Sequence, residues 1–77
     1  MEELIEYIIE NIVKNPKDVT IEKEDGENEE VTVYVINVNE EDKGIVIGKG
    51  GRTINAIRDI VKIKAIREGV RVFVKVA

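Results

Sequence analysis

Residues 39–69 separate two segments that alternate like β-strands, and this spacing constrains the fold more than any other feature. Residues 31–38 are largely β-branched, with apolar side chains on both faces, which is typical of a central strand. Residues 70–76 place a valine at every second position and predict a further strand with one apolar face. Since the sequence between them has helical periodicity, the connection is long enough to return the later strand parallel to the earlier one.

Two helices are predicted inside this connection. Asn39 offers a side-chain cap for a short helix that ends near Ile47, with Asp42 in the position of a weak capping box. Residues 52–68 carry isoleucine and valine at helical spacing and predict a long amphipathic helix. Residues 48–51, which contain three glycines, must then form a tight turn between the two helices.

The N-terminal part of the chain predicts one helix and one strand. Residues 4–14 have apolar side chains at helical spacing, and Pro16 ends this helix because it disfavours helical geometry at Asn15. Residues 19–23 alternate with a period of two and predict a strand. Residues 25–28, Asp-Gly-Glu-Asn, suit a hairpin connection to the next strand.

The predicted element order is α-β-β-α-α-β, and 77 residues leave room for a single domain, residues 1–77. We expect an α+β fold with three helices on one face of a three-stranded mixed sheet. Tyr34 and Phe73 are expected on the other face. There they either shield the sheet or, if both are exposed, form a patch for self-association.

Composition excludes most familiar chemistry. The chain has no Cys, His, Ser, Gln or Trp, so it lacks the usual nucleophiles, the usual base at neutral pH and the commonest ligands of metals. We therefore expect no catalytic residues, no metal and no cofactor. No apolar run approaches the roughly 18–20 residues that span a bilayer, so no membrane insertion is expected.

Charge is divided unevenly along the chain, although the formal net charge is −4. Residues 1–42 carry fourteen acidic and three basic side chains, whereas residues 43–77 carry nine basic and two acidic ones. Such a chain can present a basic surface despite its acidic total. The alternative is that the charges serve solubility and attraction between the two halves.

The glycine turn carries the strongest functional signal. Its glycines allow positive φ and leave no Cβ in the way of a ligand's backbone, and the helix that follows has unpaired N–H groups that favour a phosphate. Lys49 and Arg52 add positive charge. Apolar residues flank the turn and could support bases as the floor of a groove for a single strand: Val46, Ile47 and Ile54.

Other glycine-rich phosphate loops fit less well. The segment from Gly44 to Lys49 has one residue too few for a P-loop, and Gly50 stands where Ser or Thr should bind magnesium. A dinucleotide fingerprint would need Gly or Ala at Thr53, and this turn follows a helix rather than a strand. A turn that only lets two helices pack closely remains an alternative.

The segment Val46-Ile47-Gly48-Lys49-Gly50-Gly51-x-x-Ile54 resembles the signature of KH domains, which clamp about four nucleotides of single-stranded nucleic acid. The extra N-terminal helix and strand resemble the type II arrangement. Further matches at Asn15-Pro16, Glu41-Asp42-x-Gly44 and Ala56-Ile57-Arg58 make nearly the whole chain similar to the small bacterial KhpA-type RNA-binding proteins.

This resemblance implies a cytoplasmic protein that binds RNA, forms homodimers and pairs with a larger KH-containing partner. It implies that residues 48–51 are the backbone clamp, that Arg52 is a flanking base and that the apolar residues named above form the groove floor. Lys43 and Arg58 are further basic residues at or near family positions.

Two functions remain in competition at this point. The first is non-catalytic binding of single-stranded RNA, weak and loosely specific for one copy because the motif contains no aromatic residue, and strengthened by dimerisation. The second is a protein-interaction module on the KH fold, in which RNA binding is secondary.

Overall fold

The computed structural model describes residues 1–25 and 30–77 of the chain. The predicted order of helices and strands is confirmed, and the predicted hairpin turn from Gly26 to Asn28 lies outside the described residues. Short 3-10 turns at Pro16–Asp18, Glu40–Asp42 and Lys49–Gly51 connect some of the elements. The helices and strands are α1 (Glu2–Glu10), β1 (Thr20–Asp25), β2 (Val31–Asn37), α2 (Lys43–Ile47), α3 (Arg52–Glu68) and β3 (Arg71–Val76).

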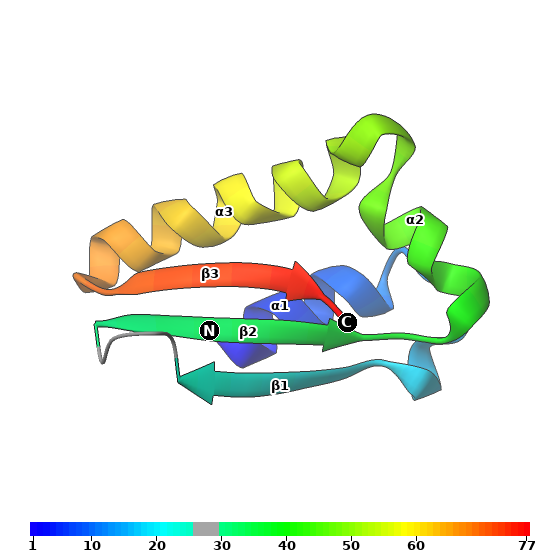
Figure 1. The fold of residues 1–77 in the computed structure, drawn as a ribbon, viewed down its shortest axis with the longest axis horizontal. Helices are drawn as coiled ribbons and strands as arrows, with labels where there is room; N and C mark the ends of the chain where they lie inside the picture. The colour runs from blue at the N-terminus through cyan, green and yellow to red at the C-terminus, as the bar shows by residue number, and fades with distance from the viewer. Residues whose placement is uncertain (26–29) are drawn as a thin grey trace.

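The three strands form one sheet in the order β1-β2-β3, so β2 is central as predicted. β1 pairs with β2 antiparallel, with Thr20 opposite Asn37, and β3 pairs with β2 parallel, with Arg71 opposite Val31. Figure 1 shows α3 running along β3, while α2 stands at the end of the sheet where β2 and β3 end. The glycine turn therefore lies at that end, between α2 and α3.

The core lies between the sheet and the helices, on one face of the sheet. Each helix contributes buried aliphatic side chains, and the strands contribute alternate residues. The described members of this cluster are Ile5, Ile9, Val19, Tyr34, Ile36, Val46, Ile54, Ile57, Val61 and Val74. This arrangement confirms the predicted fold class, with three helices on one face of a mixed sheet.

The first helix is shorter than predicted. α1 ends at Glu10, with Asn11 as its C-cap, instead of running on to Lys14. The backbone N–H groups of Lys14 and Asn15 donate to the Asp42 carboxylate, at 3.2 and 3.0 Å, and so are not available for a continued helix. The prediction was wrong here because the competing acceptor comes from a distant part of the sequence.

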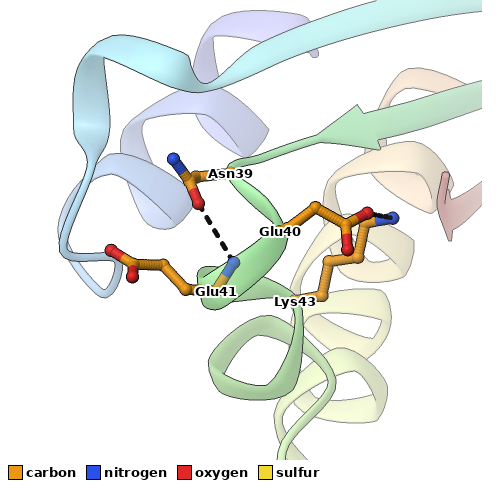
Figure 2. Close-up of polar contacts among 4 residues, drawn as sticks. All are labelled: Asn39, Glu40, Glu41 and Lys43. Atoms are coloured by element: carbon orange, nitrogen blue, oxygen red, sulfur yellow. Dashed lines mark hydrogen bonds and ion pairs between the residues drawn. The ribbon is translucent and has the colours of Figure 1, made fainter.

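The start of the second helical segment is capped as expected, but only in part. Figure 2 shows the Asn39 Oδ1 atom accepting the Glu41 backbone N–H at 3.0 Å. Asp42, predicted to complete a capping box, makes no side-chain cap hydrogen bond and instead accepts from Lys14 and Asn15, fully buried. Asn39 is thus a genuine N-cap, while Asp42 ties two distant segments together.

The expectation for Tyr34 was wrong. Tyr34 lies opposite Val74 in the register and belongs to the core under the helices, with 7% of its surface exposed. Phe73 lies opposite Val33, one residue out of phase, and is 47% exposed. The two aromatic residues therefore occupy opposite faces of the sheet, and the predicted aromatic patch for self-association does not form.

Charged side chains cover the centre of the open sheet face. Lys75 on β3 pairs with Glu24 on β1 at 3.3 Å, although β2 lies between their strands. The ion pair therefore spans the central strand, where Val35 is only 5% exposed. The long stems of such side chains can bury apolar surface while their charged ends stay in water.

The end of α3 follows the prediction. Gly69 has a φ of +71°, and its N–H and that of Val70 donate to the carbonyls of Ile66 and Ala65. This is the Schellman arrangement, which satisfies the last carbonyls of a helix. β3 begins at Arg71, so Val70 lies outside the strand and is 49% exposed.

Candidate nucleic-acid interface

The glycine turn changes the direction of the chain sharply between α2 and α3. Gly48, Gly50 and Gly51 all have positive φ, at +77°, +66° and +80°. The Gly48 N–H still donates to the Gly44 carbonyl at 2.9 Å, and the Gly51 N–H donates to the Gly48 carbonyl at 3.1 Å. The first bond joins the turn to α2, and the second closes the turn itself.

Gly48 is required by both backbone geometry and packing. Its φ and ψ of +77° and +169° lie in a region that is essentially restricted to glycine. A Cβ at this position would lie 2.7 Å from the Thr53 backbone nitrogen and would also collide with the Thr53 side chain. Thr53 in the first turn of α3 therefore packs directly against the Gly48 backbone.

Lys49 and Gly50 form the exposed tip of the turn. A Cβ built on Gly50 would meet nothing within 4 Å, so the backbone here is open to an approaching ligand. Arg52 is exposed at the first residue of α3. The amino-terminal end of this 17-residue helix adds its partial positive charge to these side chains. The tip therefore combines open backbone, positive charge and a helix terminus, which together suit a phosphate.

The three apolar residues expected to form a groove floor are not equally accessible. Val46 is fully buried and Ile54 is 6% exposed, and both belong to the core cluster. Ile47 is 41% exposed. Val46 and Ile54 thus support the turn from below, and Ile47 supplies the exposed apolar surface beside it.

Lys43 lies at the start of α2 and is engaged by a neighbouring acid. Figure 2 shows its Nζ atom paired with Glu40 Oε1, at 3.0 Å. Both side chains are well exposed, at 38% for Lys43 and 89% for Glu40, so water screens this ion pair strongly. A phosphate could compete with Glu40 for the Lys43 ammonium group.

Arg58 connects α3 to the outer edge of the sheet. Its Nε atom donates to the Val74 carbonyl at 2.9 Å, and its Nη1 atom donates to Asn55 Oδ1 at 3.2 Å. The guanidinium also lies over the Phe73 ring, with Cζ 4.9 Å from the ring centroid. Asn55 and Phe73 were not among the predicted site residues. The Asn55–Arg58 spacing of three on a helix is a signal that could have pointed to Asn55.

Asp42 is a buried carboxyl directly before the start of α2. Burial raises the pKa of its carboxyl, but hydrogen bonds from Asn15 and Lys14 and the charge of Lys14 outweigh burial and hold the pKa below its ordinary value. Asp42 is therefore an anion at neutral pH, directly before Lys43 and α2. Its contacts attach the start of α2 to the segment that follows α1.

Among residues 1–25 and 30–77, no group of three or more potential ligands could hold a metal ion. In the same residues, no helix is both long enough and apolar enough to cross a bilayer.

Comparison with known proteins places the chain in a family. A family model described as "KhpA/KhpB, KH domain" matches residues 2–76. The chain belongs to this KH-domain family. The family confirms the predicted fold class and the prediction of a non-catalytic protein. No solved structure matches the chain.

Several bacterial KhpA proteins are similar to the chain over most of its length. The chain is 42% identical over 76 residues to a Clostridium perfringens protein named "RNA-binding protein KhpA". The matched segment covers 99% of each chain. It is 40% identical over 76 residues to the Chlamydia pneumoniae protein of that name, covering 99% of this chain and 95% of the relative. The Thermotoga maritima protein of that name is 50% identical over 58 residues, or 75% of each chain.

Proposed function

We propose that residues 1–77 act as one domain that binds single-stranded RNA in the cytoplasm, without catalysis, through the turn between α2 and α3. The observation that carries this proposal is the exposed turn of positive-φ glycines, with Lys49 at its tip and Arg52 beside it. The relatives named as RNA-binding proteins support RNA as the ligand.

The turn would hold the RNA by its sugar-phosphate backbone. Phosphates approach the open backbone at Lys49 and Gly50, where no Cβ interferes, and the N-terminal end of α3 favours their charge. Arg52 neutralises a second phosphate, and Lys43 adds a further charge once it is released from Glu40. Ile47 offers apolar surface for a base. One copy then binds weakly and with loose sequence preference, because residues 46–54 contain no aromatic side chain.

The direct test places acidic side chains at the tip of the turn. Lys49→Asp combined with Gly50→Asp reverses the local charge and should weaken binding of a short single-stranded RNA at least about tenfold. Both positions are exposed and Gly50 has open space around it, so the fold should persist, which circular dichroism can verify. Fluorescence anisotropy with an end-labelled RNA measures the dissociation constant.

A matched control separates local from global charge effects. Lys17→Asp with Thr20→Asp changes the net charge by the same amount at exposed positions near the start of β1. This control should alter the dissociation constant less than about twofold, since long-range effects are screened at physiological salt. Equal losses in both variants, or no loss in the turn variant, would show that the turn is not the RNA site.

We further propose that two copies associate through an apolar stripe on α3. The stripe consists of Ile60, Ile63 and Ile66, which are 47%, 63% and 68% exposed. They follow one another at a spacing of three, so they are neighbours on the helix surface. A cavity of about 360 Å³ between α1 and α3 lies beside them, lined by Leu4, Ile60 and Ile63 among others. Dimerisation would raise the affinity for RNA through two linked weak sites.

A larger KH-containing protein is the alternative occupant of the same stripe. The apolar exposure on α3 also favours the protein-interaction function that competes with RNA binding, because contiguous exposed apolar surface is typical of protein contacts. RNA binding and protein interaction are compatible if RNA binds at the glycine turn and a protein binds at the stripe on α3.

A further inference from the structure

A continuous line of contacts runs from the glycine turn to the outer edge of the sheet. A Cβ on Gly51 would lie 3.6 Å from Asn55 Nδ2, so the end of the Asn55 side chain reaches back to the end of the turn. Asn55 Oδ1 accepts from Arg58, and Arg58 in turn donates to the Val74 carbonyl. Arg58 lies about 10 Å further along the helix axis than Gly51. A strand of RNA held at the turn and following this side of α3 therefore reaches Arg58 next.

Next to Arg58, the Phe73 ring provides a flat, exposed π-surface. The Arg58 guanidinium lies over the Phe73 ring, yet Phe73 as a residue remains 47% exposed. β3 is an edge strand, so one side of it has no neighbouring strand, and Arg58 reaches over that side from α3. Its hydrogen bonds to Val74 and Asn55 fix the plane of the guanidinium. The ring and the guanidinium form a preorganised pair.

The electrostatics around this pair favour an RNA strand. Lys62 follows Arg58 by four residues, one helical turn further from the glycine turn, and is exposed. Glu24, the acid nearest in register on the open sheet face, is paired with Lys75 at 3.3 Å. A nucleobase can thus approach the Phe73 ring while Lys62 binds the phosphate of the next nucleotide.

We propose that Arg58 and Phe73 form a base-stacking subsite that extends the RNA site beyond the glycine turn. The proposal rests on the proposed function, because the turn must hold the RNA backbone for a base to reach this pair. Its ligand is any unpaired nucleobase, since every base has a π-face that can stack on an aromatic ring or a guanidinium. The turn supplies the electrostatic attraction, and this pair supplies the stacking that the turn lacks.

A purely structural role accounts for only part of this arrangement. The hydrogen bond between Arg58 Nε and the Val74 carbonyl protects the strand edge and does not involve the ring. Shielding of the open face next to Val33 requires an apolar side chain but not an aromatic one. Replacement of the ring by an aliphatic side chain therefore separates the two roles.

The first experiment compares Phe73→Leu with the wild type in RNA binding. Loss of stacking should weaken binding of a short single-stranded RNA about five- to tenfold, while the melting temperature changes little because Phe73 is half exposed. Tyr7→Leu is the matched control, since Tyr7 is an aromatic residue on α1 with 68% of its surface exposed. The control should bind RNA like the wild type.

The second experiment detects the stacked base directly. The chain contains two tyrosines but no tryptophan, so Phe73→Trp introduces a single tryptophan at the subsite, which can be excited apart from the tyrosines. Short single-stranded RNA should quench its emission, whereas inorganic polyphosphate, which has no bases, should leave it nearly unchanged. Tyr7→Trp should show no RNA-dependent quenching.

The outcomes distinguish this proposal from the function on which it rests. Wild-type RNA affinity in Phe73→Leu, or equal quenching at positions 73 and 7, overturns the stacking subsite. If the acidic variant at Lys49 and Gly50 still loses binding in that case, the RNA site at the turn stands. If that variant binds RNA normally, both proposals fall.

Discussion

Gly48 and Gly50 stand two residues apart in the same turn and both have positive φ, but their surroundings differ. A Cβ added at Gly48 would collide with Thr53 at the start of α3, whereas one added at Gly50 would face open space. The same amino acid therefore serves two purposes within one motif. Gly48 allows two helices to meet, and Gly50 keeps the backbone accessible.

This difference predicts unequal effects of alanine at the two positions. Gly48→Ala should lower the free energy of unfolding by about 2–4 kcal/mol, because it adds both a disfavoured backbone conformation and a collision with Thr53. Gly50→Ala should lower it by about 1 kcal/mol, since only the backbone conformation opposes it. Urea denaturation followed by circular dichroism measures both values. Equal losses would show that Thr53 moves away from an added methyl group at no cost.

At the residue level, the turn could be identified from the sequence, but which of its residues pack against the protein and which stay exposed could not. The three glycines were expected to allow positive φ, and all three adopt it. The burial of Val46 and Ile54 could not be predicted, because an apolar residue beside a turn can face either the core or a ligand. The neighbours of each side chain are set by tertiary packing rather than by local sequence.

At the level of elements, the Asp42 carboxylate joins the segment that follows α1 to the start of α2. It accepts two backbone N–H groups and the Asn15 side-chain amide, and it is fully buried. A carboxylate buried with several donors is stabilised in its charged form. The position of α2, and with it the glycine turn, therefore depends on a residue outside the turn.

The depressed pKa of Asp42 predicts a pH-dependent contribution to stability. A carboxyl whose pKa is lower in the folded than in the unfolded chain stabilises the fold above the unfolded pKa, and this contribution is lost as pH falls through the folded value. Asp42→Asn should lower the melting temperature by about 5–10 °C at pH 7. The difference from the wild type should shrink below about pH 4.

Thermal melting at several pH values, followed by circular dichroism, measures this difference. Because other carboxyls also titrate below pH 4, the gap between the two proteins is informative and the absolute melting temperature is not. Asp59→Asn, which removes an exposed carboxylate from α3, should show no comparable gap. A gap between wild type and Asp42→Asn that is constant from neutral to acidic pH would contradict the prediction.

The elements themselves were largely predictable, and the exceptions have a common cause. The periodicity of residues 52–68 and the glycine at position 69 located α3 correctly. The end of α1 was missed because Asp42 competes for the N–H groups of Lys14 and Asn15 from far along the sequence. Tyr34 was placed on the wrong face because residues 31–38 are apolar on both faces. Only the register with β3 decides between the faces.

At the level of the whole molecule, the proposed RNA site and the proposed dimer surface lie on different surfaces. The basic half of the sequence forms α2, the glycine turn, α3 with Arg58, and β3 with Phe73. The exposed isoleucines of α3 lie on the same helix but outside the contact line that connects the turn to Phe73. One helix can therefore serve both RNA and a second protein chain.

The proposed dimer predicts that a charge within the stripe will separate the two copies. Ile63→Glu should convert a dimer to a monomer in sedimentation-velocity experiments, with little change in the stability of each copy because Ile63 is 63% exposed. RNA binding should weaken but persist, since the turn is intact and only the second linked site is lost. Ile63→Leu should remain dimeric.

Two results would contradict this prediction. A wild-type protein that sediments as a monomer at high concentration would remove the homodimer and leave a different protein as the occupant of the stripe. An Ile63→Glu variant that remains dimeric would place the interface elsewhere on the molecule.

The parallel pairing of β2 with β3 has a consequence for the order of events during synthesis. The glycine turn precedes β3 in the chain, so the complete turn leaves the ribosome before the strand that supplies Val74 to the core. Until that strand docks, β2 has a partner on one side only and α3 lacks its support along the sheet edge. A nascent chain ending at Gly69 would therefore carry every residue of the glycine turn in a poorly ordered form, and competence to hold RNA would arise only with the last strand.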